Sequence, residues 1–281
     1  MSLHSSARSR FLVRSNPLAW WWSLLALASS ANITAWFWLY RYLQEAQAGG
    51  LQSASNLRLM LILSAAYVFG CAFRAFWPRA DVQRICLFDT WLSSVTLGRS
   101  VATVAEVCFA AQWAIVLHRL GAMTEADTTL SIAWVIVPLI LVAECFSWHA
   151  VLTKNFFGNA IENSIWGVCF LLIIVGVCRL LPDFGGPARA VLVSAVVGIA
   201  GYLAFLATID IPMYVTRSRA AIVNNKPLRP MEGLRDASVR WIVTHDVAAW
   251  KDEIAWMSLY FTAAVWASLA LCVYYTFGRL L

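Results

Sequence analysis

The chain has little charge: only 13% of its 281 residues are Asp, Glu, Lys or Arg, while 61% are hydrophobic. A soluble domain of this length usually carries about a quarter charged residues. The mean hydropathy of +0.69 agrees with this shortage. The composition therefore excludes a soluble globular protein and indicates an integral membrane protein. The apolar runs show no period of two, which excludes the short alternating strands of a membrane β-barrel.

Several metal and cofactor motifs are also missing. The seven cysteines form no Cys-x-x-Cys pair, so small buried side chains are a simpler interpretation than a sulfur-ligated metal. The four histidines are not paired across apolar runs, as haem ligands would be. The last apolar run lacks the central lysine of microbial rhodopsins and the His-x-x-x-His pair of ceramidase-like and adiponectin-receptor-like proteins. The sequence therefore resembles none of these seven-helix families.

Seven apolar runs are long enough to cross a bilayer as helices, which takes about 20 residues each. They cover residues 18–40, 57–76, 99–120, 129–152, 157–180, 190–214 and 254–277. We therefore predict an all-α polytopic membrane protein, a seven-transmembrane-helix bundle. No internal repeat or long linker divides the chain, so residues 1–281 are expected to form a single transmembrane domain.

Seven crossings would place the two termini on opposite sides of the membrane. The loops on the N-terminal side carry thirteen Lys and Arg residues, and the loops on the other side carry six. Because basic loops are retained in the cytoplasm, we predict a cytoplasmic N-terminus and an extracytoplasmic C-terminus, in the plasma (inner) membrane. The net charge of +6 follows from this bias and from anionic lipids, so no nucleic acid is expected as a partner.

Two segments outside the runs are predicted to be helices at the cytoplasmic membrane interface. The apolar stretch 85–120 would be about 54 Å long as one helix, which is too long for about 30 Å of hydrocarbon. We therefore expect an interfacial helix over 82–96 and a bend at Gly98. Apolar residues at helical spacing predict a second, amphipathic helix over 237–250 that covers the cytoplasmic mouth of the bundle.

Acidic side chains lie inside four of the apolar runs: Glu106, Glu144, Glu162 and Asp210. A carboxylate in hydrocarbon costs about 3 kcal/mol on insertion scales and therefore indicates a functional site by default. At 1.5 Å per residue, all four fall roughly 6–12 Å from the predicted cytoplasmic boundary. Acidic residues that occurred in the runs by chance would be spread over both leaflets. We therefore expect the four carboxylates to form one site.

Further polar residues are expected to complete the site, namely Arg74, Arg99, His149, Asn159 and Tyr214. Three of them follow or precede a carboxylate by three, four or seven residues and so share its helical face. The other two, Arg74 and His149, lie at a similar depth. Pro212 is expected to loosen the turn after Asp210 and to free the backbone carbonyl of Thr208.

One chemistry that fits these residues is metal binding. Glu106, Glu144, Glu162 and Asp210 could hold a divalent metal ion, with His149 as a further ligand. Oxygen ligands of this kind suit magnesium, calcium or manganese. His149, however, lies five residues after Glu144 and about 140° around the helix, which departs from the Glu-x-x-His pattern of di-iron sites.

A second chemistry is acid–base catalysis by the four carboxylates on a lipid-like substrate. Arg99 and Arg74 would bind an anionic headgroup, and Asn159, His149 and Tyr214 would orient the site. Our leading hypothesis is an intramembrane enzyme acting on a lipid-like or apolar substrate from the cytoplasmic leaflet, with membrane lipids and a lipid-like or small-molecule ligand as partners.

Two other functions stay open. One is a proton- or cation-coupled transporter, in which the same carboxylates carry the ion. The other is a receptor or complex subunit whose polar core is purely structural. In that case ion pairs such as Arg99–Glu106 and Arg74–Asp89 would fix the helix packing.

Overall fold

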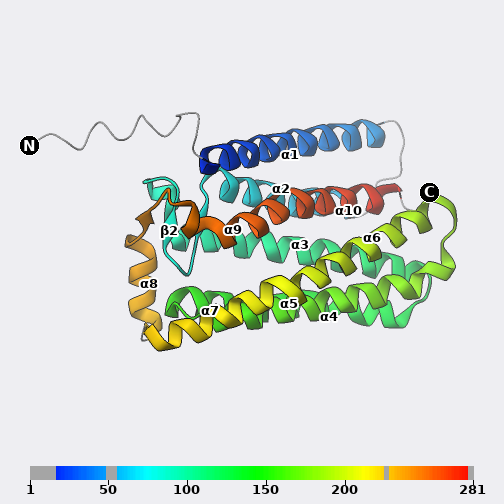
Figure 1. The fold of residues 1–281 in the computed structure, drawn as a ribbon. Coiled ribbons are helices and arrows are strands. Elements are labelled where there is room, and N and C mark those ends of the chain that lie inside the picture. Colours follow the sequence, from blue (N-terminus) through cyan, green and yellow to red (C-terminus); the bar gives the residue numbers. More distant parts are fainter. Residues whose placement is uncertain (1–16, 49–55, 225–227, 278–281) are drawn as a thin grey trace, which may run out of the picture.

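The computed structural model describes residues 17–48, 56–224 and 228–277, and almost all of them are helical. Long helices form a bundle, and a short helix and a small sheet cap one end of it (Figure 1). In chain order the elements are α1 (Pro17–Ala48), α2 (Leu57–Phe76), β1 (Arg79–Ala80), β2 (Ile85–Cys86), η1 (Trp91–Ser93), α3 (Val95–Met123), α4 (Asp127–Thr153), α5 (Phe156–Leu180), η2 (Leu181–Asp183), α6 (Gly186–Phe205), η3 (Leu206–Asp210), α7 (Ile211–Asn224), α8 (Pro230–Val239), β3 (Ile242–Val243), α9 (Val247–Leu259), η4 (Tyr260–Ala264) and α10 (Val265–Phe277).

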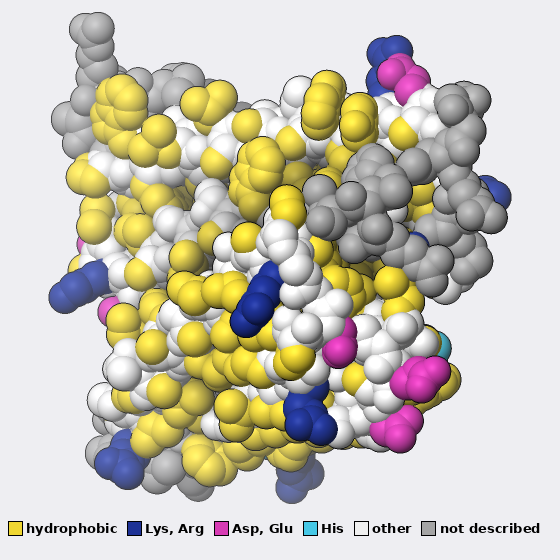
Figure 2. Space-filling model, turned by 90° about the vertical axis from the view of Figure 1, so that its right-hand side faces the viewer, with side chains coloured by type: hydrophobic (Ala, Val, Ile, Leu, Met, Phe, Trp, Pro, Cys, Tyr) yellow, Lys and Arg dark blue, Asp and Glu magenta, His cyan; other side chains and the backbone are white. Residues whose placement is uncertain are grey.

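Six helical segments in the described part of the chain are long and apolar enough to cross a membrane. They are Leu57–Phe76, Val95–Met123, Asp127–Thr153, Phe156–Asp183, Gly186–Ala220 and Val247–Thr276. Hydrophobic side chains also dominate the face of the molecule that Figure 2 shows. The chain is therefore a multi-pass integral membrane protein with an all-α bundle, as the sequence predicts.

The first predicted crossing lies in α1, which is a helix of 32 residues but is not among the six apolar segments. α1 begins at the capped end of the bundle, and α10 ends at the opposite end (Figure 1). The basic residues at 8, 10, 14 and 226, which contribute to the predicted orientation, lie outside the described residues. The count of seven crossings and the sidedness of the termini stay predictions.

Helix α6 packs differently from the other helices of the bundle. α1 to α5 contact one another in chain order, and α10 returns to contact α1, α2 and α3. α6 runs obliquely across the bundle (Figure 1), and its buried residues are only Ala188, Leu192 and Ile199. It is followed without a break by the π-helical turn η3 and by α7. A second π-helical turn, η4, joins α9 to α10.

The predicted interfacial helix over 82–96 is wrong. β1 and β2 form an antiparallel hairpin here, with Arg84 in a left-handed conformation (φ 60°) at its turn, and α3 begins only at Val95. The apolar side chains Val82 and Leu87 are buried by the protein. Strand pairing satisfies the backbone and side-chain burial covers the apolar groups, so the segment needs no membrane surface.

Gly98 lies within α3 rather than at its end, and its role is to make room. A Cβ atom at this position would clash with the guanidinium of Arg79. Nη1 of Arg79 donates hydrogen bonds to the carbonyl oxygens of Leu92 (3.0 Å) and Ser94 (2.8 Å). Burial lowers the pKa of Arg79 to about 10, which leaves it charged at neutral pH. Arg79 thus fixes the hairpin against the first turn of α3.

The predicted amphipathic helix over 237–250 is also wrong. α8 ends at Val239, and the β-branched pair Ile242–Val243 forms β3, which lies parallel to β2. β-branched residues favour such strand pairing. α9 then begins after Asp246, whose side chain accepts a hydrogen bond from the backbone nitrogen of Ala248 at 3.0 Å. An aspartate in this position starts a helix, so α9 begins later than predicted and continues into the last span.

α8 is anchored to the capped end of the bundle. Its Asp236 carboxylate accepts a hydrogen bond from Nε of Arg84 at 3.1 Å and lies 3.1 Å from Nζ of Lys154. Gly233 packs so closely on the end of α4 that a Cβ atom would overlap with the carbonyl oxygen of Leu152. The ion pairs of Asp236 and the close backbone contact of Gly233 therefore both hold α8 against the end of α4.

We predict that Gly233→Ala disrupts the docking of α8. The added methyl meets backbone, which cannot rotate away, so the free energy of unfolding should fall by roughly 1–3 kcal/mol. Denaturant unfolding in detergent micelles measures this change. Gly198→Ala is the control, because its Cβ would have no atom within 4 Å. A Gly233→Ala protein as stable as the wild type would contradict the described contact.

We predict an acid-sensitive docking of α8 through Asp236. Burial alone would raise the pKa of Asp236, but the hydrogen bonds from Arg84 and Lys154 outweigh it and lower the pKa below the ordinary value. A lowered folded-state pKa stabilises the docked helix above the unfolded-state pKa of about 3.9, and this stabilisation is lost as the pH falls through the folded-state value.

Amide hydrogen-exchange protection of α8, corrected for the intrinsic rates, should therefore stay constant from neutral pH to about 5 and decrease below about 4. Asp236→Asn is the matched control, since it should show weaker protection that no longer changes in that window. A wild-type protection that is flat down to the lowest pH at which the bundle stays folded would contradict the assignment.

Candidate functional site

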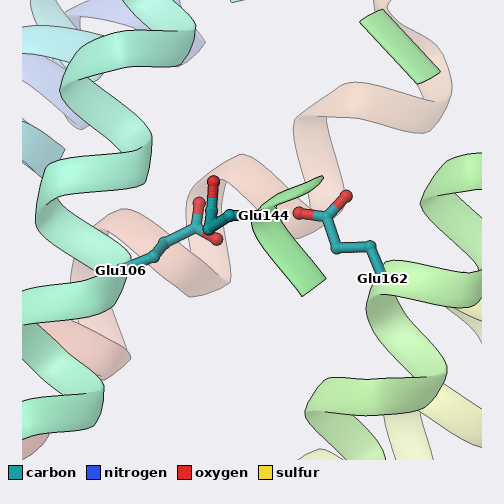
Figure 3. Close-up of side chains that lie close together, drawn as sticks. All are labelled: Glu106, Glu144 and Glu162. Carbon is teal, nitrogen blue, oxygen red and sulfur yellow. The ribbon is translucent and has the colours of Figure 1, made fainter. Parts of the chain in front are cut away.

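Three of the predicted carboxylates meet inside the bundle, and we call them the glutamate triad. Glu106 comes from α3, Glu144 from α4 and Glu162 from α5, and their carboxyl groups point toward one another (Figure 3). All three residues are buried, and each offers an oxygen that lies within 4.8 Å of the other two. The spacing of acidic residues along three separate runs therefore predicts that these three carboxyl groups lie together, while their role as a functional site stays a prediction.

Arg99 is in contact with all three members of the glutamate triad. Its Nη2 atom lies 2.7 Å from Oε2 of Glu144 and 3.2 Å from Oε1 of Glu106. Its Nη1 atom lies 3.7 Å from Oε1 of Glu162. We expected Arg99 to bind an anionic headgroup, but its charge is already balanced by carboxylates. Its position makes it the counter-ion of the triad.

Hydrogen bonds from neighbouring side chains orient the triad further. Oγ1 of Thr103 donates to Oε2 of Glu144 at 2.5 Å and accepts a hydrogen bond from Nε1 of Trp148 at 3.0 Å. Nδ2 of Asn159 donates to Oε2 of Glu162 at 2.9 Å. Among the described residues, Oε1 of Glu144 and Oδ1 of Asn159 are buried acceptors without a hydrogen-bond partner. Such atoms are costly unless something else satisfies them.

Asp210, the fourth predicted carboxylate, does not join the triad. It ends the π-helical turn η3, and its Oδ2 accepts a hydrogen bond from Nδ2 of Asn163 on α5 at 2.7 Å. No cation lies within ion-pair distance of it among the described residues. The predicted loosening of the helix around Pro212 takes the form of this π-helical turn, in which the nitrogen of Ile211 bonds to the carbonyl of Leu206. π-helical turns often mark functional positions.

A cavity of about 690 Å³ connects Asp210 to the triad. Its polar part is lined by acidic and basic side chains, and its apolar part extends along α3, α5, α6 and α10. The charged residues of the lining are Arg74, Asp81, Arg99, Glu106, Glu162, Asp210 and Glu253, and the apolar part includes Trp113, Leu117, Phe170, Leu192, Leu271 and Tyr274. Glu144 is not among the lining residues.

The other predicted site residues divide into two groups. Asn159, Tyr214 and Arg74 line the cavity, as Arg99 does. His149 is exposed on α4 and lies outside the glutamate triad, as its position about 140° around the helix from Glu144 requires. By distance alone the triad could hold a metal ion, but such an ion would find Arg99 already in contact with each carboxylate.

Two acidic residues of the cavity were missed because they precede or follow the apolar runs. Nη2 of Arg74 pairs with Oδ2 of Asp81 at 3.1 Å, which corrects the expected pair Arg74–Asp89. Glu253 on α9 is buried and accepts hydrogen bonds from Gln83 (2.7 Å), Arg217 (2.9 Å) and Trp256 (2.7 Å). Glu253 therefore joins the hairpin, α7 and α9 at the capped end. No pattern in the sequence distinguishes these two from ordinary loop residues.

Comparison with known proteins finds no family model, no curated protein and no solved structure that this chain matches. The geometry of the cavity and of the glutamate triad is therefore the basis of the functional argument.

We predict that Arg99→Gln destabilises the fold strongly and that Glu144→Gln relieves part of this effect. Removing one side of a buried ion pair leaves charge uncompensated and costs about 3–5 kcal/mol. The double variant removes one negative charge with the positive one, so its cost should be smaller than the sum of the two single costs by about 1 kcal/mol or more.

Reversible unfolding of the two single variants and the double variant, in the same micelles, measures this coupling energy. Arg119→Gln is the control, because Arg119 pairs with the backbone carbonyl of Tyr275 rather than with a carboxylate. Additive costs for positions 99 and 144 would contradict the role of Arg99 as counter-ion.

Proposed function

We propose that this protein is an intramembrane enzyme that converts a lipid-like substrate. The observation that carries the proposal is the cavity itself: two carboxylates of the triad open into its polar part, while its remainder is apolar. Its volume of about 690 Å³ lies within the range of about 300–1,000 Å³ that ligand sites occupy. An amphipathic molecule fits such a lining, with its polar group near the carboxylates and its chain along α6 and α10.

Glu106 and Glu162 are the acid–base pair in this proposal, since both line the cavity and both contact Arg99. Three carboxylates around one guanidinium carry excess negative charge, and a proton retained by one of them relieves the repulsion. The pair can then hold a proton donor beside a proton acceptor, which is the arrangement that acid–base catalysis needs. Arg99 and Glu144 position the pair, and Asn159, Tyr214 and Asp210 bind the substrate.

The membrane arrangement belongs to the same proposal. α1 would be a seventh crossing, since its 32 residues would span about 48 Å. The N-terminus would be cytoplasmic and the C-terminus extracytoplasmic, in the plasma membrane, with residues 1–281 as one domain. The capped end, which contains the basic segment between α7 and α9, would then face the cytoplasm, and the substrate would reach the cavity from that leaflet.

A proton- or cation-coupled transporter is the second candidate. The two π-helical turns η3 and η4 favour it, because residues of both line the cavity and transporters bind their cargo at interrupted helices. A subunit with a purely structural core is supported only by the Arg99 ion pairs. The cavity, which such a core would not need, argues against it.

We predict that the reconstituted protein converts a lipid and that Glu162→Gln removes the conversion. Vesicles of phosphatidylethanolamine and phosphatidylglycerol, with total membrane lipid extract added, are incubated with the protein and followed by untargeted lipid mass spectrometry. Loss of an acid–base group should slow the appearance of product by about a hundredfold or more. Glu125→Gln, at an exposed carboxylate in the turn between α3 and α4, should leave the rate unchanged.

Two further measurements separate the alternatives. Conversion that survives EDTA supports direct acid–base chemistry, whereas its loss and its recovery with Mn²⁺ would assign a metal ion to the triad instead. A pH dye inside the same vesicles reports proton flux. Flux that depends on Glu162, without any lipid conversion, would overturn the enzyme in favour of the transporter.

A further inference from the structure

The charges that line the cavity are unequal, and this bears on the ligand. The described residues of the lining include five acidic side chains, Asp81, Glu106, Glu162, Asp210 and Glu253, but only two basic ones, Arg74 and Arg99. Both basic side chains are already paired within the protein, Arg74 with Asp81 and Arg99 with the triad. The cavity therefore has no unbalanced positive charge for an anionic group.

Asp210 is the only acidic member of this set that neither pairs with a cation at ion-pair distance nor accepts a hydrogen bond from one among the described residues. Glu253 receives a hydrogen bond from Arg217, and the triad surrounds Arg99. Asp210 receives only the amide of Asn163 and is 8% exposed. A carboxylate at this depth is stable when it is protonated or when a cation approaches it. The structure thus leaves one position in the cavity where a cation on a ligand would be stabilised.

Asn159 points independently to a ligand that donates hydrogen bonds. It lines the same cavity and is 8% exposed, and its amide nitrogen is used in the bond to Glu162. The remaining atom, Oδ1, is an acceptor with no partner among the described residues. A buried acceptor of this kind is satisfied by an N–H or O–H group and not by an anion, which has only acceptors.

Aromatic rings line the same cavity as well. Trp166, Tyr202, Tyr214, Trp256 and Tyr260 all contribute to its lining. The face of an aromatic ring attracts a cation, and this attraction grows when water is excluded. An anionic group has no such attraction to these rings. The rings, the acceptor of Asn159 and the unbalanced carboxylate of Asp210 therefore favour the same ligand chemistry.

We infer that the cavity binds an amphiphile with a cationic, amine-type headgroup, with Asp210 as its counter-ion and Oδ1 of Asn159 as a hydrogen-bond acceptor. The apolar part of the cavity along α6 and α10 receives the hydrocarbon chain. The inference rests on the proposed function only in taking this cavity as the substrate site. It names the substrate class of that site and replaces the anionic headgroup that the sequence suggests.

Three photoreactive probes with the same hexadecyl chain test the inference: an amine, an alcohol and a carboxylic acid, each with a diazirine on the chain and an alkyne tag. The protein is labelled in phosphatidylcholine nanodiscs, and peptides of α6 and α10 are quantified by mass spectrometry. The amine should label these peptides about tenfold more than the acid, a modest size for a buried charge pair. The alcohol should fall between them.

Asp210→Asn is the decisive variant, because asparagine keeps an acceptor for Asn163 and removes the charge. It should reduce labelling by the amine to the level of the alcohol and leave labelling by the alcohol unchanged. Asp183→Asn, at an exposed aspartate of η2, is the matched control and should keep the full preference for the amine.

The wild-type protein alone can overturn the inference, whatever the stability of the variants. Labelling by the acid that equals or exceeds labelling by the amine would overturn it, as would equal labelling by amine and alcohol. A preference for the amine that persists in Asp210→Asn would also overturn the role of Asp210. Lipid conversion that depends on Glu162, together with no preference for the amine, would leave the enzyme standing and remove only its substrate class.

Discussion

A guanidinium surrounded by carboxylates inside the helix bundle sets the conditions for the rest of this fold. Arg99 contacts Glu106, Glu144 and Glu162, which come from three consecutive helices. None of these four charges would be stable there alone, since removing each one from water costs several kcal/mol. Their mutual contact therefore fixes the relative depth and rotation of α3, α4 and α5. α6 contributes no residue to these ion pairs and buries only Ala188, Leu192 and Ile199.

The cavity follows from this difference between the helices. α3 and α5 are locked together near the triad, while α6 buries few residues and crosses obliquely. Apolar side chains such as Leu117 and Leu271 line an open space beside α6. The polar part of that space lies where the locked helices present their charges. The cavity is therefore amphipathic because the ion pairs of α3, α4 and α5 lie at one part of it, while the sparsely packed α6 borders its apolar part.

The sequence predicts the triad well because two simple periodicities act together. A helix rise of 1.5 Å converts the position of an acidic residue in each run into a depth, and Arg99 lies two turns before Glu106 on the same face of α3. The sequence predicts the capped end badly because local apolar pattern cannot distinguish burial by lipid from burial by protein. Ile85 and Ile242 are 157 residues apart, yet they pair in one small sheet.

Residues that act through long-range pairing are invisible for the same reason. Asp81 and Glu253 lie outside the apolar runs, so nothing in their surroundings marks them as costly. They become buried only because the hairpin, α7 and α9 close over the end of the bundle. Arg74 lines the cavity, but its expected partner Asp89 is wrong, because Arg74 pairs with Asp81 of the same loop.

The site divides its carboxylates into two kinds, and this division connects structure with function. The triad has its counter-ion within the protein, so in the proposed enzyme it would exchange protons with a substrate while the helices stay in place. Asp210 has no counter-ion of its own among the described residues and sits on a π-helical turn, where α6 passes into α7. The triad is paired within the protein and stabilises the fold, whereas Asp210 is not paired at ion-pair distance with any described residue. In the proposed enzyme the first kind would serve catalysis and the second kind would serve recognition, because a cationic ligand beside Asp210 would stabilise its charge.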